Sequence, residues 1–285
     1  MTERFYELAG IRFRILGPKD CLRDSGQFLK NYDAQPGPWD VECTVCTVDA
    51  LSAPEGEQCY HSPSIQIFRR GDTQLRYQGS VFHSLEEAYL RIARCGNRSH
   101  IQIKASAIPH GITDDVLLSC MEPIHHVTAA GGFLLHASWI RYRDRAILFT
   151  GPSGIGKSTQ AALWEKYRGA ELINGDRAAV FPGPGGPHVR GIPFCGSSCV
   201  NKNQTMPLAA VVCLSQAPEN RITRLRGVRA FRPLWEGCSL DLWNQADIAL
   251  GTQAVVDTVS TVPVFHLACT PDEQAVQTLE KEGIF

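Results

Sequence analysis

The stretch AILFTGPSGIGKSTQAALWEKY, residues 146–167, decides how the rest of the chain is interpreted. It opens with an apolar segment typical of a buried strand, continues through a glycine-rich loop and ends in a segment typical of a helix. The loop, residues 151–158, fits the pattern G-x-x-x-x-G-K-[ST], in which backbone N–H groups and a helix N-terminus surround phosphate oxygens. The stretch therefore predicts a strand–loop–helix unit that binds a nucleoside triphosphate with Mg²⁺.

Each residue type in this loop has a chemical reason. Glycines let N–H groups turn toward phosphate oxygens, the Lys157 ammonium reaches the outer phosphates, and the Ser158 hydroxyl coordinates magnesium. Asp176 follows in the stretch ELINGDR, where its carboxylate would complete the metal shell; the alternative is an ordinary turn aspartate. The residues expected to hold the nucleotide are Gly151, Ser153, Gly154, Ile155, Gly156, Lys157, Ser158 and Thr159.

The loop motif alone does not define the reaction. A GTPase would carry a guanine-reading N-K-x-D sequence, and the nearest stretch, VNKNQ at residues 200–204, lacks the aspartate. An ordinary ATPase would carry a long apolar strand ending in Asp-Glu far downstream, whereas here a short strand and Asp176 follow the helix. Neither class explains the sequence.

Composition limits the partners. The chain has 285 residues, 44% hydrophobic and 20% charged, with a formal net charge of -1, which gives no bulk attraction to nucleic acid or to an anionic membrane. No apolar run approaches the roughly 20 residues of a membrane helix, and the start, MTERFYELAG, lacks the apolar stretch of a secretory signal. We expect a cytoplasmic protein.

Eleven scattered cysteines suit reduced thiols in that compartment. Cys43 and Cys46, with Cys59 and His61, could form a zinc site, but VECTVCTV is typical of a strand that would place Cys43 and Cys46 on opposite faces. A metal site at residues 125–126, two histidines, is not expected without acidic or cysteine partners nearby.

The pattern of predicted strands and helices divides the chain into two regions. Residues 1–130 form a strand-rich N-terminal region with helices near its end, and residues 131–285 contain the loop. GIRFRIL, from residue 10, alternates like a half-buried strand. SLEEAYLRIARCG, residues 84–96, is predicted as a helix capped by Ser84 and ended by Gly96, and a further helical stretch is interrupted at Pro123. Strands and helices mix, which favours an α/β fold with a mixed sheet.

Beyond the loop, the order LLHASWIRYRDRAILFTGPSGIGKST…ELINGDRAAV…GIPFCGSS, within residues 134–198, resembles the catalytic domain of HPr serine kinase/phosphorylase. It also resembles the smaller HPr-kinase-like proteins, some of which accompany peptide-modifying enzymes, and more remotely ATP-dependent phosphoenolpyruvate carboxykinase. The resemblance implies an α/β catalytic domain with the mixed sheet of these proteins, ATP and Mg²⁺ as cofactors, and a homo-oligomer as one open alternative.

Carried over by position, Lys157 and Asp176 are catalytic, Ser158 and Asp176 bind the metal, and His136 lies beside the transferring phosphate. A packed histidine in an apolar strand is an equally good interpretation of His136 from the sequence. The residues expected near the acceptor are Arg177, the turn formers Gly191, Pro193 and Gly196, and Lys202 and Asn203 in the following loop.

One departure from the family pattern concerns Gly175. HPr kinases usually carry two adjacent aspartates at this point, the first being the base for the acceptor hydroxyl, and this chain has Gly175 before Asp176. Since general-base catalysis contributes about 10²–10⁴ in rate while positioning carries most of phosphoryl transfer, the change does not require loss of activity. Asp176 could take both roles, His136 could accept the proton, or the substrate could differ.

The leading hypothesis is an ATP- and Mg²⁺-dependent kinase that transfers the γ-phosphoryl group to a hydroxyl, serine in a peptide, a protein or the free amino acid. The alternatives are a catalytically impaired nucleotide-binding module that acts through a protein partner, and a phosphorylase or carboxykinase-like enzyme. An arginine-rich stretch could bind ATP or an acidic substrate, or could be a solvated face: Arg221, Arg224, Arg226, Arg229 and Arg232.

Overall fold

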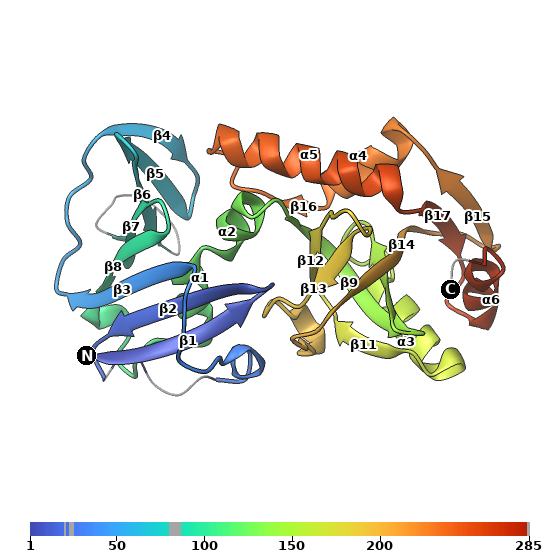
Figure 1. The fold of residues 1–285 in the computed structure, drawn as a ribbon, viewed down its shortest axis with the longest axis horizontal. Helices are drawn as coiled ribbons and strands as arrows, with labels where there is room; N and C mark the ends of the chain where they lie inside the picture. Colours follow the sequence, from blue (N-terminus) through green and yellow to red (C-terminus); the bar gives the residue numbers. More distant parts are fainter. Residues whose placement is uncertain (20, 23–25, 80–86, 284–285) are drawn as a thin grey trace. The chain divides into compact units, whose positions relative to one another are not determined.

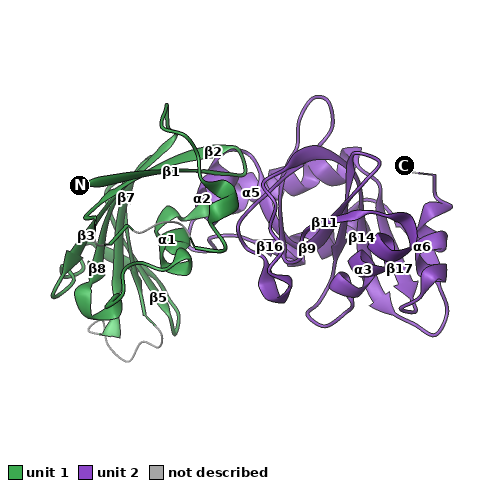
Figure 2. Ribbon diagram, turned by 90° about the horizontal axis from the view of Figure 1, so that it is seen from below, with its two compact units in different colours: residues 1–123 green, residues 124–285 purple. Residues whose placement is uncertain are grey.

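The computed structural model describes residues 1–19, 21–22, 26–79 and 87–283. The chain forms two compact units, Met1–Pro123 and Ile124–Phe285 (Figures 1 and 2). Each unit is built on its own mixed sheet, and helices are few. The fold is therefore mixed α/β, as the sequence predicts at this level.

The first unit carries an eight-stranded sheet. Its strands are β1 Thr2–Leu8, β2 Ile11–Gly17, β3 Val41–Val48, β4 Glu57–His61, β5 Ile65–Arg70, β6 Thr73–Gln78, β7 Leu90–Cys95 and β8 Arg98–Lys104. Their order is β1-β2-β3-β8-β7-β6-β5-β4, with β3 parallel to both neighbours and the remaining pairs antiparallel. In β2 the alternation predicted from the sequence is confirmed, because Ile11, Phe13 and Ile15 are buried.

The helix predicted at residues 84–96 is wrong where the structure describes it. Leu90–Cys95 forms β7, hydrogen-bonded between β6 and β8, and Ser84 lies outside the described residues. Leu90 and Ile92 are fully buried in this sheet. Pairing on both sides and burial therefore outweigh a local helical preference that is weak by comparison.

Helices α1, Asp114–Met121, and α2, Pro123–Ala129, meet at the predicted interruption. Glu122 ends α1 in the left-handed conformation with φ 44°, and the ring of Pro123 begins α2, where a missing N–H is tolerated. The other helices are α3 Lys157–Arg168, α4 Val228–Glu236, α5 Gln245–Thr261 and α6 Glu273–Glu280, with short 3₁₀ turns η1 Lys30–Tyr32, η3 Ala105–Ala107 and η4 Gly196–Ser198. In the described part of the chain, no helix combines the length and the apolar character needed to cross a membrane.

The second unit carries a nine-stranded sheet. Its strands are β9 Phe133–Tyr142, β10 Arg145–Thr150, β11 Glu171–Asn174, β12 Arg177–Phe181, β13 His188–Arg190, β14 Thr205–Gln216, β15 Arg221–Leu225, β16 Cys238–Ser239 and β17 Val264–Cys269. The main order is β10-β9-β12-β13-β14-β17-β15, while β11 and β16 also pair with β9. Strands β10, β14 and β17 are parallel, so their carboxyl ends share one edge, and the glycine-rich loop leaves β10 at that edge.

Both faces of this sheet are covered by helices. Ala146 and Leu148 of β10 join a core with α4 and α5, which pack side by side (Figure 1). Ile147 and Phe149 face the opposite way, into a core with α3 and α6. Burial on both faces explains why β10 is an uninterrupted apolar run rather than an alternating strand.

Candidate functional site

The glycine-rich loop, residues 151–158, joins β10 to α3. Gly154 and Gly156 have φ values of 75° and 114°, a conformation that glycine adopts without strain. In the described chain no side chain caps α3 at Gly156, and the first turn contains no acidic residue. The first N–H groups of a helix have no intrahelical acceptor, so this end of α3 offers hydrogen-bond donors and a positive dipole to an anion.

Lys157 lies folded against the loop. Its side chain is mostly buried, and its Nζ donates hydrogen bonds of 3.0 Å to the carbonyl oxygens of Gly151 and Pro152. Burial lowers the pKa of Lys157, and the nearby Asp176 carboxylate opposes that shift. The ammonium group is therefore held at the loop next to an acidic side chain.

His136, Asp176 and Arg177 form one cluster where β9 pairs with β12. Arg177 lies opposite His136 in the register, and the Asp176 carboxylate is 3.3 Å from both His136 Nε2 and Arg177 Nε. Arg177 also donates to the Ser239 hydroxyl. Burial and the charge of Lys157 lower the pKa of His136, with Arg177 adding to the shift and Asp176 opposing it. A neutral imidazole at this position can accept a proton.

A pocket of about 380 Å³ opens between this cluster and the loop. It combines residues of the loop and of the β9–β12 cluster with residues from the end of α4 and from β16, which the sequence did not suggest. Burial raises the pKa of Cys238 in its wall to about 12, so that thiol is not a nucleophile at neutral pH. The lining residues are His136, Thr150, Gly151, Pro152, Ser153, Arg177, Pro233, Glu236, Gly237, Cys238 and Ser239.

Asn174, at the end of β11, is a positioning residue that sequence reasoning missed. It is fully buried; its amide nitrogen donates to the carbonyls of Ile192 and Phe194 at 2.8 and 2.7 Å. Its oxygen accepts the N–H groups of Asp176 and Arg177 at 2.8 and 2.9 Å. Asn174 thus ties the Asp176 turn to the following turn. The only sequence signal was a polar residue ending a short apolar strand.

The predicted turn formers Gly191, Pro193 and Gly196 follow β13, and one of them lies next to Asp176. A Cβ added to Gly191 would lie 2.4 Å from the Lys202 carbonyl oxygen, so glycine is required for this close approach. A Cβ added to Gly196, which has φ 55°, would lie 3.1 Å from Asp176 Cβ. Pro193 lies between them in the same turn. Of these three residues, Gly196 is the one that lies against Asp176.

Lys202 and Asn203, which were expected near the acceptor, lie outside the lining of the pocket beside the loop. Lys202 Nζ pairs with Glu171 Oε1 at 2.7 Å, and this contact lowers the pKa of Glu171.

Ser198 occupies the space next to Gly175. A Cβ built on Gly175 would lie 2.1 Å from Ser198 Oγ and 2.6 Å from Ser198 Cβ. The hydroxyl donates to the Cys195 carbonyl at 2.7 Å and accepts the Val200 N–H at 3.2 Å. With Ser198 in this position, no side chain fits at residue 175.

The cysteines of β3 point apart, as the strand alternation predicts. Cys43 is buried and its Sγ donates to the Cys120 carbonyl, whereas Cys46 donates to the Ile101 carbonyl. Within the described residues, the group that could hold a metal ion is a different one: His125, Asp241 and Asp247, whose ligand atoms lie within 4.8 Å of one another. Its two carboxylates lie far from His125 in the sequence, one in the segment before α5 and the other in the first turn of α5.

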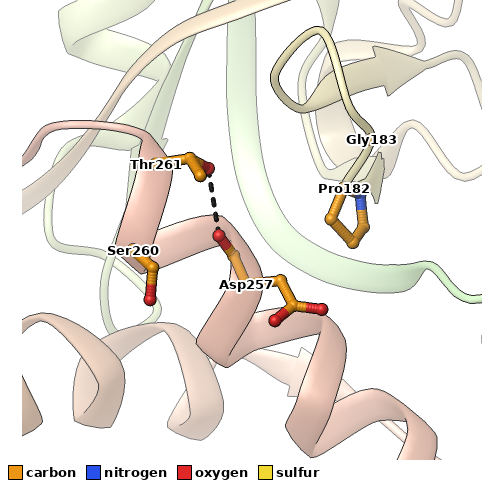
Figure 3. A pocket seen from close by; sticks show the side chains of 5 residues that line it. All are labelled: Pro182, Gly183, Asp257, Ser260 and Thr261. Atoms are coloured by element: carbon orange, nitrogen blue, oxygen red, sulfur yellow. Dashed lines mark hydrogen bonds between the residues drawn. The ribbon is translucent and has the colours of Figure 1, made fainter.

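Figure 3 shows another pocket of the second unit. Its volume is also about 380 Å³. It is lined by the turn after β12 at Pro182 and Gly183, and by Asp257, Ser260 and Thr261 near the end of α5. It shares no residue with the pocket beside the loop.

Comparisons with known proteins show remote likeness to solved structures. No protein-family model matches the chain. No curated protein matches it either. Among solved structures, the chain is similar to the Hpr(Ser) kinase/phosphatase from Coxiella burnetii, with 14% identity over 53% of this chain and 95% of that chain, and a TM-score of 0.31. A likeness this remote carries no argument about the reaction.

Proposed function

We propose that this chain is an ATP- and Mg²⁺-dependent kinase that transfers the γ-phosphoryl group to a hydroxyl. The acceptor we propose is serine in a peptide, a protein or the free amino acid. The observation that carries the proposal is the single pocket in which the glycine-rich loop meets His136 and Arg177. It combines a place for phosphates with a proton acceptor and a cation.

The loop supports phosphate binding. The uncapped N-terminus of α3 and the Lys157 ammonium offer donors and positive charge without a competing carboxylate in the first turn. To reach a phosphate, Lys157 would exchange its two carbonyl acceptors for phosphate oxygens. Such preorganised charge is the main means of accelerating phosphoryl transfer.

The oxygen donors near the loop fit magnesium. Ser158 presents an exposed hydroxyl at the start of α3, and the Asp176 carboxylate is partly exposed. Hydroxyl and carboxylate oxygens suit this hard cation, and these two residues would hold it. When bound, Mg²⁺ would neutralise charge on the phosphates.

In the transfer, the bond from Pγ to the leaving ADP oxygen breaks and a bond from the acceptor oxygen to Pγ forms. The hydroxyl proton passes to His136, whose lowered pKa keeps it neutral, or to Asp176 beside it. Arg177, fixed by Asp176 and Ser239, contributes positive charge at the pocket wall. The acceptor class rests on the family resemblance alone.

A nucleotide-binding module is the second candidate, and Ser198 is the observation that favours it. Because its hydroxymethyl group fills the space at Gly175, the first aspartate of the kinase pattern is not only absent but also has no room. A chain without this base could bind ATP for recognition by a partner.

The test is to incubate the protein with ATP and Mg²⁺ and with serine, serine peptides and cell extract, followed by mass spectrometry for one added phosphoryl group. Lys157→Ala should abolish the product, while Lys166→Ala, an exposed lysine later in α3, should leave it unchanged. ATP binding without a phosphorylated product would contradict the kinase and favour the module.

A further inference from the structure

The arginine-rich stretch ends on α4, directly beside the pocket. Arg226, Arg229 and Arg232, which we name the arginine ridge, are exposed. Arg226 and Arg229 have no carboxylate partner among the described residues, while Arg232 pairs with Glu236 at 2.8 Å. The ridge is therefore a concentration of positive charge on a protein whose net charge is -1.

The two faces of α4 are separated cleanly. Ala230 and Leu234 are buried, and Phe231 and Trp235 stack on each other over the same core. On a helix with 3.6 residues per turn, Arg229 and Glu236 lie on the face opposite to these side chains, with Arg232 beside them. The outer face of α4 thus runs from Arg229 to Glu236, and Glu236 lines the pocket.

Local stability does not explain the ridge. Arg229 lies in the first turn of α4, where the helix dipole disfavours positive charge, and that turn contains no acidic residue. An uncompensated cation at this end lowers the stability of the helix. Their position is explained if an external anion provides the compensation.

We propose that the arginine ridge docks an acidic segment of the peptide or protein that presents its hydroxyl to the pocket, an inference that rests on the kinase function proposed above. Guanidinium groups bind carboxylates bidentately, and a row of them along a helix suits an extended acidic peptide. The partner is a polypeptide with aspartate or glutamate near the acceptor serine.

The geometry sets the spacing of those acidic residues. At about 1.5 Å per residue, Arg232 and Arg229 lie roughly 6 and 10 Å along the helix from Glu236. An extended peptide covers about 3.3 Å per residue. Acidic side chains about two to four residues from the acceptor hydroxyl would therefore meet the ridge.

Binding is measured first, without ATP, by fluorescence anisotropy of labelled serine peptides. One pair carries aspartates two to four positions before or after the serine, and the matched pair carries alanines there. We expect the acidic peptides to bind more than about 10-fold more tightly at low salt, and Arg229→Glu to weaken them by about 5- to 10-fold. Glutamate is favourable in a first helical turn, so this variant should fold.

Arg221→Glu is the matched control. Arg221 is exposed at the far end of β15, so this variant makes the same change of charge away from the outer face of α4. It should weaken binding less than about 2-fold. Equal losses in the two variants, no preference for the acidic peptides, or equal competition by single-stranded nucleic acid would each overturn the docking proposal.

Transfer is measured next with the same peptides. Arg229→Glu should raise KM for the acidic peptide and leave kcat for the alanine peptide unchanged, whereas a merely structural defect would lower both rates. Tight acidic-peptide binding with no transfer to any peptide would contradict the kinase function and leave the docking surface in place. Transfer with no preference for the acidic peptides would support the kinase function and contradict the docking surface.

Discussion

The second unit contains two histidine–carboxylate pairs, and they differ in access to solvent. His125 Nδ1 lies 2.8 Å from Asp247 Oδ2, with side-chain exposures of 12% and 3%. His136 Nε2 lies 3.3 Å from Asp176 Oδ1, with exposures of 39% and 23%. The first pair is sealed from solvent at the first turn of α5, and the second borders the pocket at the loop.

The comparison teaches that residue types alone do not define a site. A sealed pair satisfies its own polar atoms and contributes to stability, because an unpaired buried carboxylate would be costly. An open pair keeps atoms available for a substrate and lies where other charges shift its protonation. Asp247 is also in the first turn of α5, where the helix dipole favours a negative charge.

Replacing the carboxylate of each pair should give the largest difference between the two pairs, one in the rate of transfer and the other in stability. We expect Asp176→Asn to lower the rate of phosphoryl transfer by about 10²–10³-fold, because a charge at the transferring group is lost. The melting temperature should change little, since the carboxylate is partly solvated. Product formation and thermal unfolding, measured on the same sample, test this prediction. A large fall in stability with normal transfer would contradict it.

In the sealed pair the expected effect is on stability. Asp247→Asn should reduce the free energy of unfolding by about 1–3 kcal/mol and leave transfer by the folded protein unchanged. Urea unfolding monitored by circular dichroism gives the free energy. Chelator treatment is the control: a lowered melting temperature in the wild type but not in Asp247→Asn would mean that a cation holds His125, Asp241 and Asp247 together.

The pH dependence of transfer should report the open pair. The pKa of His136 is lowered from its usual 6.5, so the imidazole stays neutral through neutral pH and charges only in more acidic solution. The rate should be flat above pH 6.5 and fall as the pH drops below that value. His136→Gln should remove this inflection and lower the plateau by about 10-fold or more. An unchanged inflection in the variant would assign the proton to another group.

The lowered pKa of His136 also makes stability depend on pH, and stability, like the rate of transfer, falls in acid. Because the unfolded chain binds a proton more readily than the folded His136 does, the unfolded state gains protons first as the pH falls. Stability contributed by this residue is therefore present above pH 6.5 and lost in acid.

Gly175, which precedes Asp176 of the open pair, tests packing at this site. Gly175→Asp should destabilise the protein by about 1–3 kcal/mol, because its Cβ would collide with Ser198. Ser198→Gly in the same chain should recover most of that loss, and a double-mutant cycle of unfolding free energies measures the coupling. Additive losses would mean that the two residues do not compete for space.

Local sequence predicted much of the frame. The apolar run before the loop, the glycines within it and the helical pattern after it correctly predicted β10 and α3. The alternation of β2 and the break at Pro123 were also visible, since each depends on neighbouring residues only. The strand β7 was mistaken for a helix because its state is decided by β6 and β8, which a local pattern does not contain.

The sequence by itself determined the mixed α/β class, the strand–loop–helix unit and the candidates Lys157 and Asp176, because spacing along the chain encodes them. Only the tertiary structure decided that His136 faces Asp176, that Asn174 ties two turns together and that Glu236 borders the loop pocket. These contacts join residues that lie far apart in the chain or on different elements. Their distances follow from strand register and helix packing, which come from the whole fold and not from any single segment.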